Sequence, residues 1–493
     1  MSYSHNVLGK DEETNARRFL EQNHFKGAFE MSDDHEFTRR GFLQTAAAVA
    51  AVSALPGLGA PTILSSPGPN EQVRYGFIGT GTQGCALLEF LTTIPEGRCV
   101  ATCDIYPPNL KKGVEIIGTN PATYEDYRQL LDRKDIDAVM IATPLHLHGR
   151  MILDGLSAGK HVFVEKSMFF KEEEAEPIRQ AAAAHPNQVV QIGLHRRSSV
   201  LYQVATEMVR KGALGKVMFV ESCVDDNSTW RRPVAEAKYE RLINWRMYRE
   251  YSGGLMAEMG SHFIDVANWV LGTEPVSVIG MGGIDYWKDG RETHDNVQAI
   301  FEYPGGKKLY FNSILFNGHN QFGVLVMGDQ GTLDINDDRA IYFREPVAKV
   351  SSGPAKESWW AGATVSKTAA QKGILVFPER GGGSKGFLER ELQYARRWLA
   401  SLGIYEYREP FNPYWGELVS FFASVREGKP TIVPVGVGMA DALAVIYANR
   451  AIDTGQKVFW PPEHARQGPK AGCIGINQVD CGTDMSSKRE SGA

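Results

Sequence analysis

The sequence predicts an α/β protein built from two domains. An apolar strand at residues 73–78 runs directly into a glycine-rich turn and a helix-like stretch. Further apolar strands alternate with helix-like stretches as far as about residue 195, and beyond residue 275 strand-like runs follow one another instead. A chain of 493 residues is also longer than one hydrophobic core usually supports.

Composition narrows the class of protein. The chain is 43% hydrophobic and 23% charged, and its net charge of −5 gives no basis for binding nucleic acid or an anionic membrane surface. Six cysteines form no dense disulfide framework. We interpret Cys85, Cys99 and Cys103 as small buried residues, whereas Cys473 and Cys481 are free to pair. No metal site is predicted.

Residues 1–70 are predicted to be an export signal and linker. A polar, acidic stretch precedes Thr38-Arg39-Arg40-Gly41-Phe42-Leu43, and an alanine-rich apolar run with a small-residue cleavage site follows. This order is typical of a twin-arginine signal, so we expect the Tat export machinery as a partner and a periplasmic or otherwise exported protein. The alternative is a frayed amphipathic leader, which would leave the protein in the cytoplasm.

Residues 71–195 are predicted to form a Rossmann dinucleotide-binding domain. The strand Val73–Ile78 leads into Gly79-Thr80-Gly81-Thr82-Gln83-Gly84, and a helix follows from Cys85 to Leu91. In this strand–turn–helix setting the first glycine permits a tight turn, the second lets the backbone approach a pyrophosphate, and the third allows close helix packing. The helix N-terminus then offers free N–H groups to the phosphates.

A second strand, from Cys99 to Cys103, ends at Asp104. A carboxylate at this position accepts hydrogen bonds from the adenosine ribose and repels a 2′-phosphate, which favours NAD over NADP as the cofactor. The alternative role for Asp104 is a simple helix or turn cap.

Two later motifs resemble the Gfo/Idh/MocA oxidoreductase family. The strand Ala138–Ala142 is followed by Thr143-Pro144-Leu145-His146-Leu147-His148, and Gly159–Lys166 matches the family's G-K-H-V-x-x-E-K, with Ser167 where proline is usual. The resemblance spans about residues 72–462 and implies an NAD(P)-dependent oxidoreductase of the glucose–fructose oxidoreductase or inositol dehydrogenase type. It places these side chains at the cofactor: Thr143, Pro144, His148, Glu165 and Lys166.

A third motif begins at Gly253-Gly254 and is read as one continuous helix. Apolar residues at Met259, Phe263, Val266 and Val270 form one stripe, and the titratable residues Glu258, His262 and Asp265 share another face. From the residues alone, this second face is explained by a self-satisfied polar network or by a solvated surface, and for His262 alone we would prefer that interpretation. The family has G-G-x-x-x-D-x-G-x-H-x-x-D here, which implies that His262 acts on the substrate hydroxyl.

The resemblance implies hydride transfer from a carbinol carbon to the nicotinamide. His262 would be the general base, Lys166 would hold the same oxygen, and Glu258 would orient the substrate or relay the proton. Two stretches are candidates for the sugar pocket, although an interdomain ion-pair cluster explains them equally well. Their residues, with the trailing acid of the helix motif, are Arg196, Arg197, Trp245, Arg246, Tyr248 and Asp265.

Residues 196–462 are expected to form the substrate domain. Strand-like runs at 276–281, 296–303, 308–316 and 322–327 indicate the open, mostly antiparallel sheet with which this family binds substrate and pairs subunits, so a homo-oligomer is expected. Residues 351–405 do not match the family and are interpreted as an insertion or surface excursion. The polar tail, residues 463–493, is predicted to be disordered.

Export and NAD together constrain the function, because no supply of NAD exists outside the cytoplasm. Two redox-neutral schemes satisfy this constraint. One sugar is oxidised while another is reduced, or a glycoside is oxidised, loses its aglycone by elimination, adds water and is reduced again. The exported branch of the family that uses the second scheme lacks the glycine-rich helix motif, so we favour an oxidoreductase. A non-catalytic sugar-binding homologue is the third possibility. It is favoured by two departures from the family motifs, Glu258 where the family has aspartate and Ser167 where proline is usual.

Overall fold

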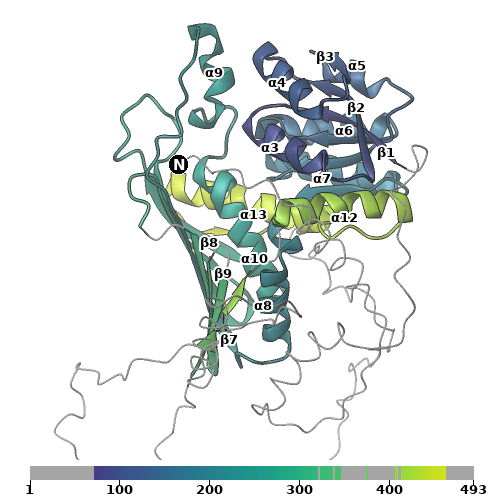
Figure 1. Cartoon of the computed structure of the whole chain (residues 1–493). Coiled ribbons are helices and arrows are strands. Elements are labelled where there is room, and N and C mark those ends of the chain that lie inside the picture. The colour runs from purple at the N-terminus through teal and green to yellow at the C-terminus, as the bar shows by residue number, and fades with distance from the viewer. Residues whose placement is uncertain are drawn as a thin grey trace, which may run out of the picture.

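The structure is a computed structural model, and it describes residues 72–319, 322–336, 339–345, 374–375, 406–408 and 412–461. Two sheets stand side by side with helices packed around and between them (Figure 1). Several predictions lie outside the described residues: the export signal, nearly all of the segment 351–405, and the tail with Cys473 and Cys481.

The first sheet is fully parallel, with the strand order β3-β2-β1-β4-β5-β6. Its strands are β1 (Val73–Ile78), β2 (Gly97–Cys103), β3 (Ala122–Tyr124), β4 (Ala138–Ile141), β5 (His161–Glu165) and β6 (Val190–Gly193). Its helices are α3 (Thr82–Leu91), α4 (Pro107–Ile117), α5 (Tyr127–Leu131), α6 (His148–Ser157) and α7 (Ala175–Ala184). The order reverses between β1 and β4, which confirms the Rossmann prediction and marks where ligands bind such sheets.

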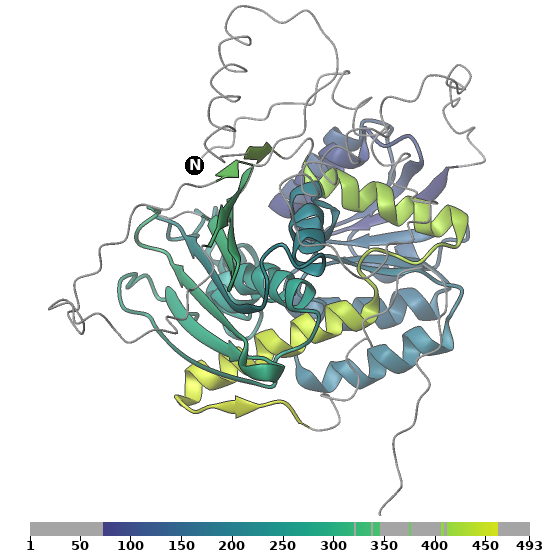
Figure 2. The ribbon, with the colours of Figure 1, turned by 90° about the horizontal axis from the view of Figure 1, so that it is seen from below.

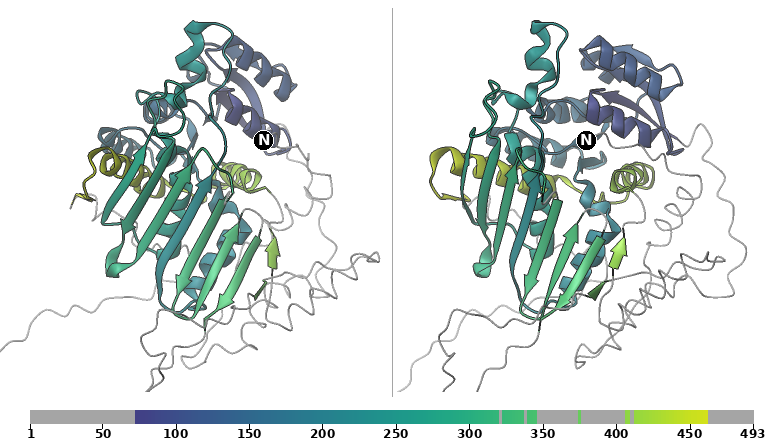
Figure 3. Two further views of the ribbon diagram at one scale, coloured as in Figure 1. Left: turned by 90° about the vertical axis from the view of Figure 1, so that its left-hand side faces the viewer. Right: turned by 60° about the vertical axis from the view of Figure 1, so that its left-hand side comes forward.

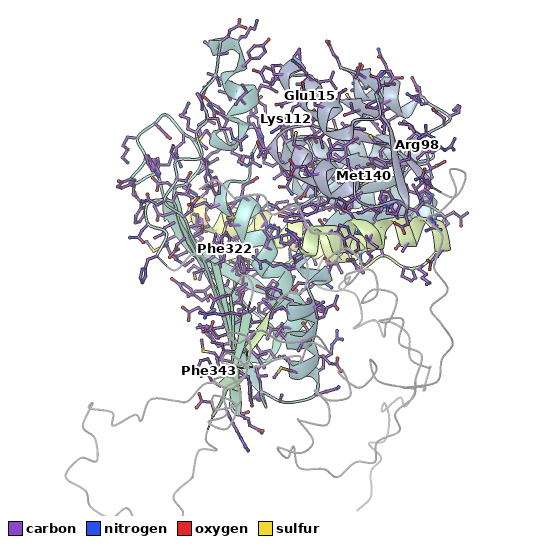
Figure 4. The ribbon with its side chains drawn as sticks, in the orientation of Figure 1. Arg98, Lys112, Glu115, Met140, Phe322 and Phe343 are labelled. Atoms are coloured by element: carbon purple, nitrogen blue, oxygen red, sulfur yellow. The ribbon has the colours of Figure 1, made fainter. Side chains whose placement is uncertain are left out.

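The strand sequences explain this arrangement. Every residue of β4 is buried, and Met140 at its middle lies inside the domain in Figure 4. Strands covered by helices on both faces read as continuous apolar runs, as this one does. The predicted thiols Cys85, Cys99 and Cys103 are all free and buried in this core.

The second sheet is mixed and mostly antiparallel, as predicted, with the order β14-β13-β12-β11-β7-β10-β9-β8-β16 and β15 beside β13. Its strands are β7 (Val217–Asp225), β8 (Ser277–Gly283), β9 (Asn296–Glu302), β10 (Lys308–Ile314), β11 (Phe322–Gly328), β12 (Gly331–Asn336), β13 (Arg339–Arg344), β14 (Ile374–Leu375), β15 (Glu406–Arg408) and β16 (Val458–Phe459). Among these pairs the parallel one joins β7 to β10. β7, in the middle of the sheet, was not predicted.

Helices cover one face of this sheet and separate it from the Rossmann domain (Figure 2). They are α8 (Val200–Arg210), α10 (Ser261–Leu271) and α13 (Val435–Thr454). α13 is long and apolar enough to cross a membrane, but 61% of its most apolar window is buried inside the protein, which identifies a core helix. No described helix covers the opposite face, which is turned toward the viewer in the left view of Figure 3.

One helix within the range predicted for the substrate domain packs on the first domain instead. This helix, α12 (Pro413–Glu427), lies against the Rossmann domain, where Phe422 contacts Tyr75 at a ring separation of 5.6 Å. Phe421 lies against Phe163 of β5 in the same way, at 5.8 Å. Both phenylalanines are fully buried, so the apolar face of α12 completes the core of the first domain.

Candidate active site

One large cleft lies where the carboxyl ends of the parallel strands face the substrate domain. Its volume of about 1740 Å³ exceeds the roughly 300–1,000 Å³ of ordinary single-ligand pockets. Phe322, which lines it, lies at the end of the second sheet nearer the Rossmann domain, whereas Phe343 lies at the far end (Figure 4). The cleft therefore has room for a dinucleotide and a substrate together.

The glycine-rich turn has the geometry that a dinucleotide requires. Gly79 has a φ of +94°, and a Cβ on Gly84 would lie 1.9 Å from the carbonyl oxygen of Gly79. A Cβ on Gly81 would make only an ordinary van der Waals contact, with the Asn109 side-chain nitrogen at 3.9 Å. Gly81 caps α3 without a side-chain hydrogen bond, which leaves the first N–H groups of the helix facing the cleft beside Thr82 and Gln83.

Asp104 lies on the cleft wall at the end of β2. Its carboxylate accepts hydrogen bonds from the backbone N–H groups of Thr80 and Tyr106, both at 2.8 Å. Burial raises the pKa of Asp104, while these hydrogen bonds oppose the rise. Thr80 is fully buried and does not line the cleft, and its hydroxyl donates a hydrogen bond to the Asp104 carboxylate.

The loops after β4 and β5 are tied together by His148. Its Nδ1 lies 2.8 Å from the carbonyl oxygen of Ser167 and its Nε2 lies 2.9 Å from that of Thr143. Because each ring nitrogen faces a backbone carbonyl oxygen and the side chain is buried, His148 positions these loops and does not offer a nitrogen to the cofactor. Thr143 and Pro144 line the cleft as the sequence indicated.

Lys166 links the Rossmann domain to the helix that carries His262. The Lys166–Ser167 peptide bond is cis. The Lys166 ammonium donates to the carbonyl oxygens of Ala257 at 3.2 Å and Glu258 at 2.6 Å. Glu165 accepts from Gln83 at 2.8 Å, and although Lys166 opposes it, burial raises the pKa of Glu165.

The predicted continuous α-helix is wrong at its start. Residues Met256–Gly260 form a π-helical turn, and α10 begins at Ser261. The wider turn changes the angular spacing, so the α-helical face drawn through Glu258, His262 and Asp265 does not hold. Glu258 and His262 line the cleft, whereas Asp265 is directed elsewhere.

Glu258 belongs to a charged group at the floor of the cleft. Its carboxylate accepts a hydrogen bond from Arg246 Nε at 2.7 Å, and the Arg246 guanidinium lies 4.3 Å from the ring centre of Trp245. Burial raises the pKa of Glu258, but the charges of Arg246 and Lys166 outweigh this effect and hold it below its ordinary value. Glu258 is therefore an ionised, positioned carboxylate.

His262 lies among aromatic side chains and positively charged side chains. Its ring meets that of His195 edge-on at 4.7 Å, and His195 stacks on Tyr414 at 4.0 Å. Burial, with the nearby charge of Lys166, holds the pKa of His262 well below its ordinary value. The imidazole is therefore neutral near pH 7, and its Nδ1 has no hydrogen-bond partner among the described residues.

The predicted sugar-pocket residues separate into two groups. Arg196, Trp245 and Arg246 line the cleft. Arg197 and Asp265 instead bind each other, with Arg197 Nη2 2.7 Å from the Asp265 carboxylate, and neither lines the cleft. Tyr248 also lies outside the lining, and its hydroxyl donates to Glu240 at 3.0 Å.

Tyr414 lines the cleft, although the sequence did not predict it as a site residue. Asn412 caps α12 by accepting from the Tyr414 backbone N–H, and Pro413 starts the helix, so Tyr414 projects from its first turn toward His195. More than two hundred residues separate Tyr414 from His195 in the chain. The local signal was the Asn-Pro helix start, which predicts a helix but not its neighbour.

Two family models match the chain. The "Oxidoreductase family, NAD-binding Rossmann fold" model covers residues 73–194, and the "GFO/IDH/MocA C-terminal domain" model covers residues 202–334. Together they account for more than half of the chain.

Similar proteins include both dehydrogenases and a glycosidase. A scyllo-inositol 2-dehydrogenase (NAD(+)) of Bacillus subtilis is 28% identical over 215 residues, 43% of this chain and 58% of that protein. An alpha-N-acetylgalactosaminidase of Shewanella oneidensis is 30% identical over 238 residues, 43% of this chain and 51% of that protein. The chain thus spans only a little more than half the length of the curated relatives it matches.

Among solved structures, scyllo-inositol dehydrogenase from Lactobacillus casei with bound NAD(H) and scyllo-inositol superposes with a TM-score of 0.56. It is 22% identical, and the match covers 79% of this chain and 99% of that one. The myo-inositol 2-dehydrogenase from Lactobacillus plantarum has the same TM-score at 21% identity, with the same two coverages. These likenesses establish the shared fold.

Proposed function

Because the chain belongs to the Gfo/Idh/MocA family of oxidoreductases, with an NAD-binding Rossmann domain, we propose that it oxidises a hydroxyl-bearing carbon of a sugar, sugar derivative or cyclitol. The observation that carries the proposal is the placement of His262 and Lys166 in the same cleft as the glycine-rich turn. The residues of that turn fit a dinucleotide, and NAD when bound would supply a hydride acceptor.

His262 is the general base in this mechanism. The neutral imidazole takes the proton from the substrate hydroxyl while the hydride leaves the carbon that bears this hydroxyl. The low pKa of His262 keeps the imidazole neutral before the reaction. Lys166 has three N–H donors, of which two are directed at the carbonyl oxygens of Ala257 and Glu258. The third is available to the substrate oxygen and stabilises the negative charge that develops there.

Glu258 positions these groups. Its ion pair with Arg246 fixes the carboxylate, and its own carbonyl oxygen holds the Lys166 ammonium. We therefore assign Glu258 to orienting the substrate, with Arg246 and Trp245 supplying a polar and an aromatic wall to the sugar pocket.

The first experiment is to purify the protein, dialyse it extensively, denature it and measure released nicotinamide cofactor per chain. Near-stoichiometric NAD is the expected result, followed by turnover of a sugar or cyclitol panel without added NAD. A protein that carries none but binds added NAD is an ordinary dehydrogenase with exchanging cofactor. A protein with no affinity for NAD contradicts the proposal and leaves the non-catalytic sugar-binding homologue.

An NAD-assisted glycosidase is the second candidate. The relative named alpha-N-acetylgalactosaminidase supports it, since it is 30% identical over 238 residues, 43% of this chain. Aryl glycosides distinguish the two functions. Release of the aryl alcohol with no net change in NADH absorbance identifies the glycosidase, whereas a sugar-dependent rise in NADH identifies the dehydrogenase.

We also propose that the twin-arginine motif directs export. The support is the Arg39-Arg40 pair with its apolar run. A variant with both arginines changed to lysine is expected to remain in the cytoplasm when the fractions of the cell are assayed for the protein. Periplasmic recovery of this variant at the level of the natural sequence would show that Arg39 and Arg40 do not direct export.

A further inference from the structure

A segment of the substrate domain crosses the mouth of the cleft above the glycine-rich turn. This arm, residues 226–248, leaves the end of β7 and carries the short helix α9 (Glu240–Ile243). Figures 1 and 3 show α9 standing beside the Rossmann domain, away from the rest of its own domain. The arm therefore meets the Rossmann domain on the side where a cofactor would lie.

The arm touches the Rossmann domain at two places that flank the cofactor site. The Arg232 guanidinium donates to the hydroxyl of Thr82, the first residue of α3. The Tyr239 ring meets that of Tyr106 edge-on at 4.9 Å, and the Tyr106 backbone N–H binds Asp104. The Arg232 contact lies at the helix N-terminus that is predicted to bind the phosphates. The Tyr239 contact lies beside Asp104, which is predicted to bind the ribose.

Hydrogen bonds within the arm, and one from Arg231 to Asp289, order its backbone. The Asn244 side chain accepts a hydrogen bond from the backbone N–H of Arg232 at 2.7 Å and donates one to the backbone carbonyl of Arg232 at 2.9 Å. Arg231 pairs with Glu240 and donates to the Asp289 carbonyl at 2.8 Å. These bonds order the backbone of Arg232, so that ligand binding costs the conformational entropy of its exposed side chain but not that of its backbone.

Arg232 differs from the neighbouring arginines in having no carboxylate partner among the described residues. Arg231, Arg241 and Arg246 each form an ion pair with a carboxylate. Arg232 lines the cleft, where its guanidinium binds the Thr82 hydroxyl, and no carboxylate pairs with it in the part of the chain that the structure describes. A guanidinium beside the free N–H groups of a helix N-terminus forms a site for a phosphate group, because its planar fork binds two oxygens at once.

We propose that Arg232 binds the cofactor's pyrophosphate, and that the arm holds the dinucleotide against the glycine-rich turn so that it dissociates slowly. This inference rests on the proposed function, since it takes NAD as the ligand of the cleft. It adds a residue of the substrate domain to a site otherwise built from the Rossmann domain. A cofactor retained in this way suits an enzyme that regenerates its cofactor within each catalytic cycle.

The test compares Arg232→Ala and Arg232→Lys with the natural sequence, using Lys238→Ala as the matched control. Lys238 is a cation on the same arm, does not line the cleft and pairs with Glu236. Calorimetry gives the Kd for NAD, ADP-ribose and adenosine, and stopped-flow fluorescence gives the NADH dissociation rate. Circular dichroism checks that each variant is folded.

Arg232→Ala is expected to weaken NAD and ADP-ribose about 10- to 100-fold, as for loss of a charge-assisted hydrogen bond, and to speed NADH release similarly. Adenosine, which lacks the pyrophosphate, should bind unchanged, Arg232→Lys should be intermediate, and Lys238→Ala should match the natural sequence. Unchanged ADP-ribose affinity in Arg232→Ala, or an equal loss for adenosine, overturns the pyrophosphate contact. Failure of the natural sequence to bind NAD overturns the proposed function itself, and this inference with it.

Discussion

At the scale of single residues, the candidate site depends on charges that are fixed by their neighbours. Glu258 is kept ionised by Arg246 and Lys166, while His262 is kept neutral by burial and by Lys166. An ionised carboxylate and a neutral imidazole thus face one cleft at the same pH. This division of protonation states is what an acid–base reaction near neutral pH requires.

Replacing His262 by alanine should abolish most turnover and leave cofactor binding intact. Loss of a general base typically lowers kcat about 10²- to 10⁴-fold, and the glycine-rich turn does not depend on this ring. Steady-state kinetics and NAD calorimetry on the same preparation test both parts. Turnover within a few-fold of the natural sequence would remove His262 from the mechanism.

The Arg197–Asp265 pair should act on stability and not on substrate binding. Asp265 is 1% exposed, and three hydrogen bonds join it to Arg197. Breaking a buried pair by removing one partner costs about 3–5 kcal/mol, so Asp265→Asn should lower the free energy of unfolding in urea with little change in KM. A raised KM at unchanged stability would restore the substrate role that the sequence predicted.

At the scale of elements, two C-terminal helices carry buried acids. Glu417 on α12 and Asp441 on α13 are fully buried, and their carboxyl oxygens have no hydrogen-bond partner among the described residues. Burial raises the pKa of both groups well above their ordinary values. In the folded state they therefore hold their protons at pH values where the unfolded chain has released them.

This difference predicts a pH dependence of stability. As pH rises through the ordinary carboxyl range the unfolded chain loses these protons and the folded chain keeps them, so the contribution to stability falls. Glu417→Gln, which is neutral at every pH, should raise the melting temperature at pH 8 more than at pH 4. Thermal unfolding followed at both pH values tests this, with the exposed Glu427→Gln on the same helix as control. An equal shift at both pH values would contradict the protonated state of Glu417.

At the scale of the whole molecule, the described helices cover one face of the second sheet and leave the other face without a helix. Ile279 and Met281 on β8 and Ile300 on β9 point to the other face, where they are 44%, 77% and 42% exposed. Neighbouring exposed apolar side chains on a sheet are typical of a surface that binds another protein. If the chain forms the homo-oligomer expected from the family resemblance, this face is predicted to be where a second copy packs.

Ile300→Lys should then convert the assembly to monomers. A charge at the centre of an apolar interface is left without a partner, and its desolvation opposes association. Light scattering after size-exclusion chromatography measures the mass, with Lys111→Ala on the Rossmann surface as control. A natural sequence that is already monomeric would exclude this pairing.

Much of the cofactor half of this protein is determined by local sequence. Gly79 has a positive φ, Gly84 packs against the Gly79 carbonyl oxygen, and Asp104 follows its strand directly, so motif and spacing suffice to predict them. The same holds for the strands of the second sheet whose alternating pattern is clear. His262 and Lys166 were identified through the family resemblance, and the structure places both on one cleft.

Tertiary structure alone decided the remaining features. The π-helical turn breaks the spacing that a helical wheel assumes, which is why Asp265 turns to Arg197 and Glu258 turns to Arg246. Tyr414 and Arg232 reach the cleft from distant segments, and no local pattern records a contact made only when the chain has folded. The sequence determines which groups a short segment can form, whereas packing between segments determines which of those groups meet.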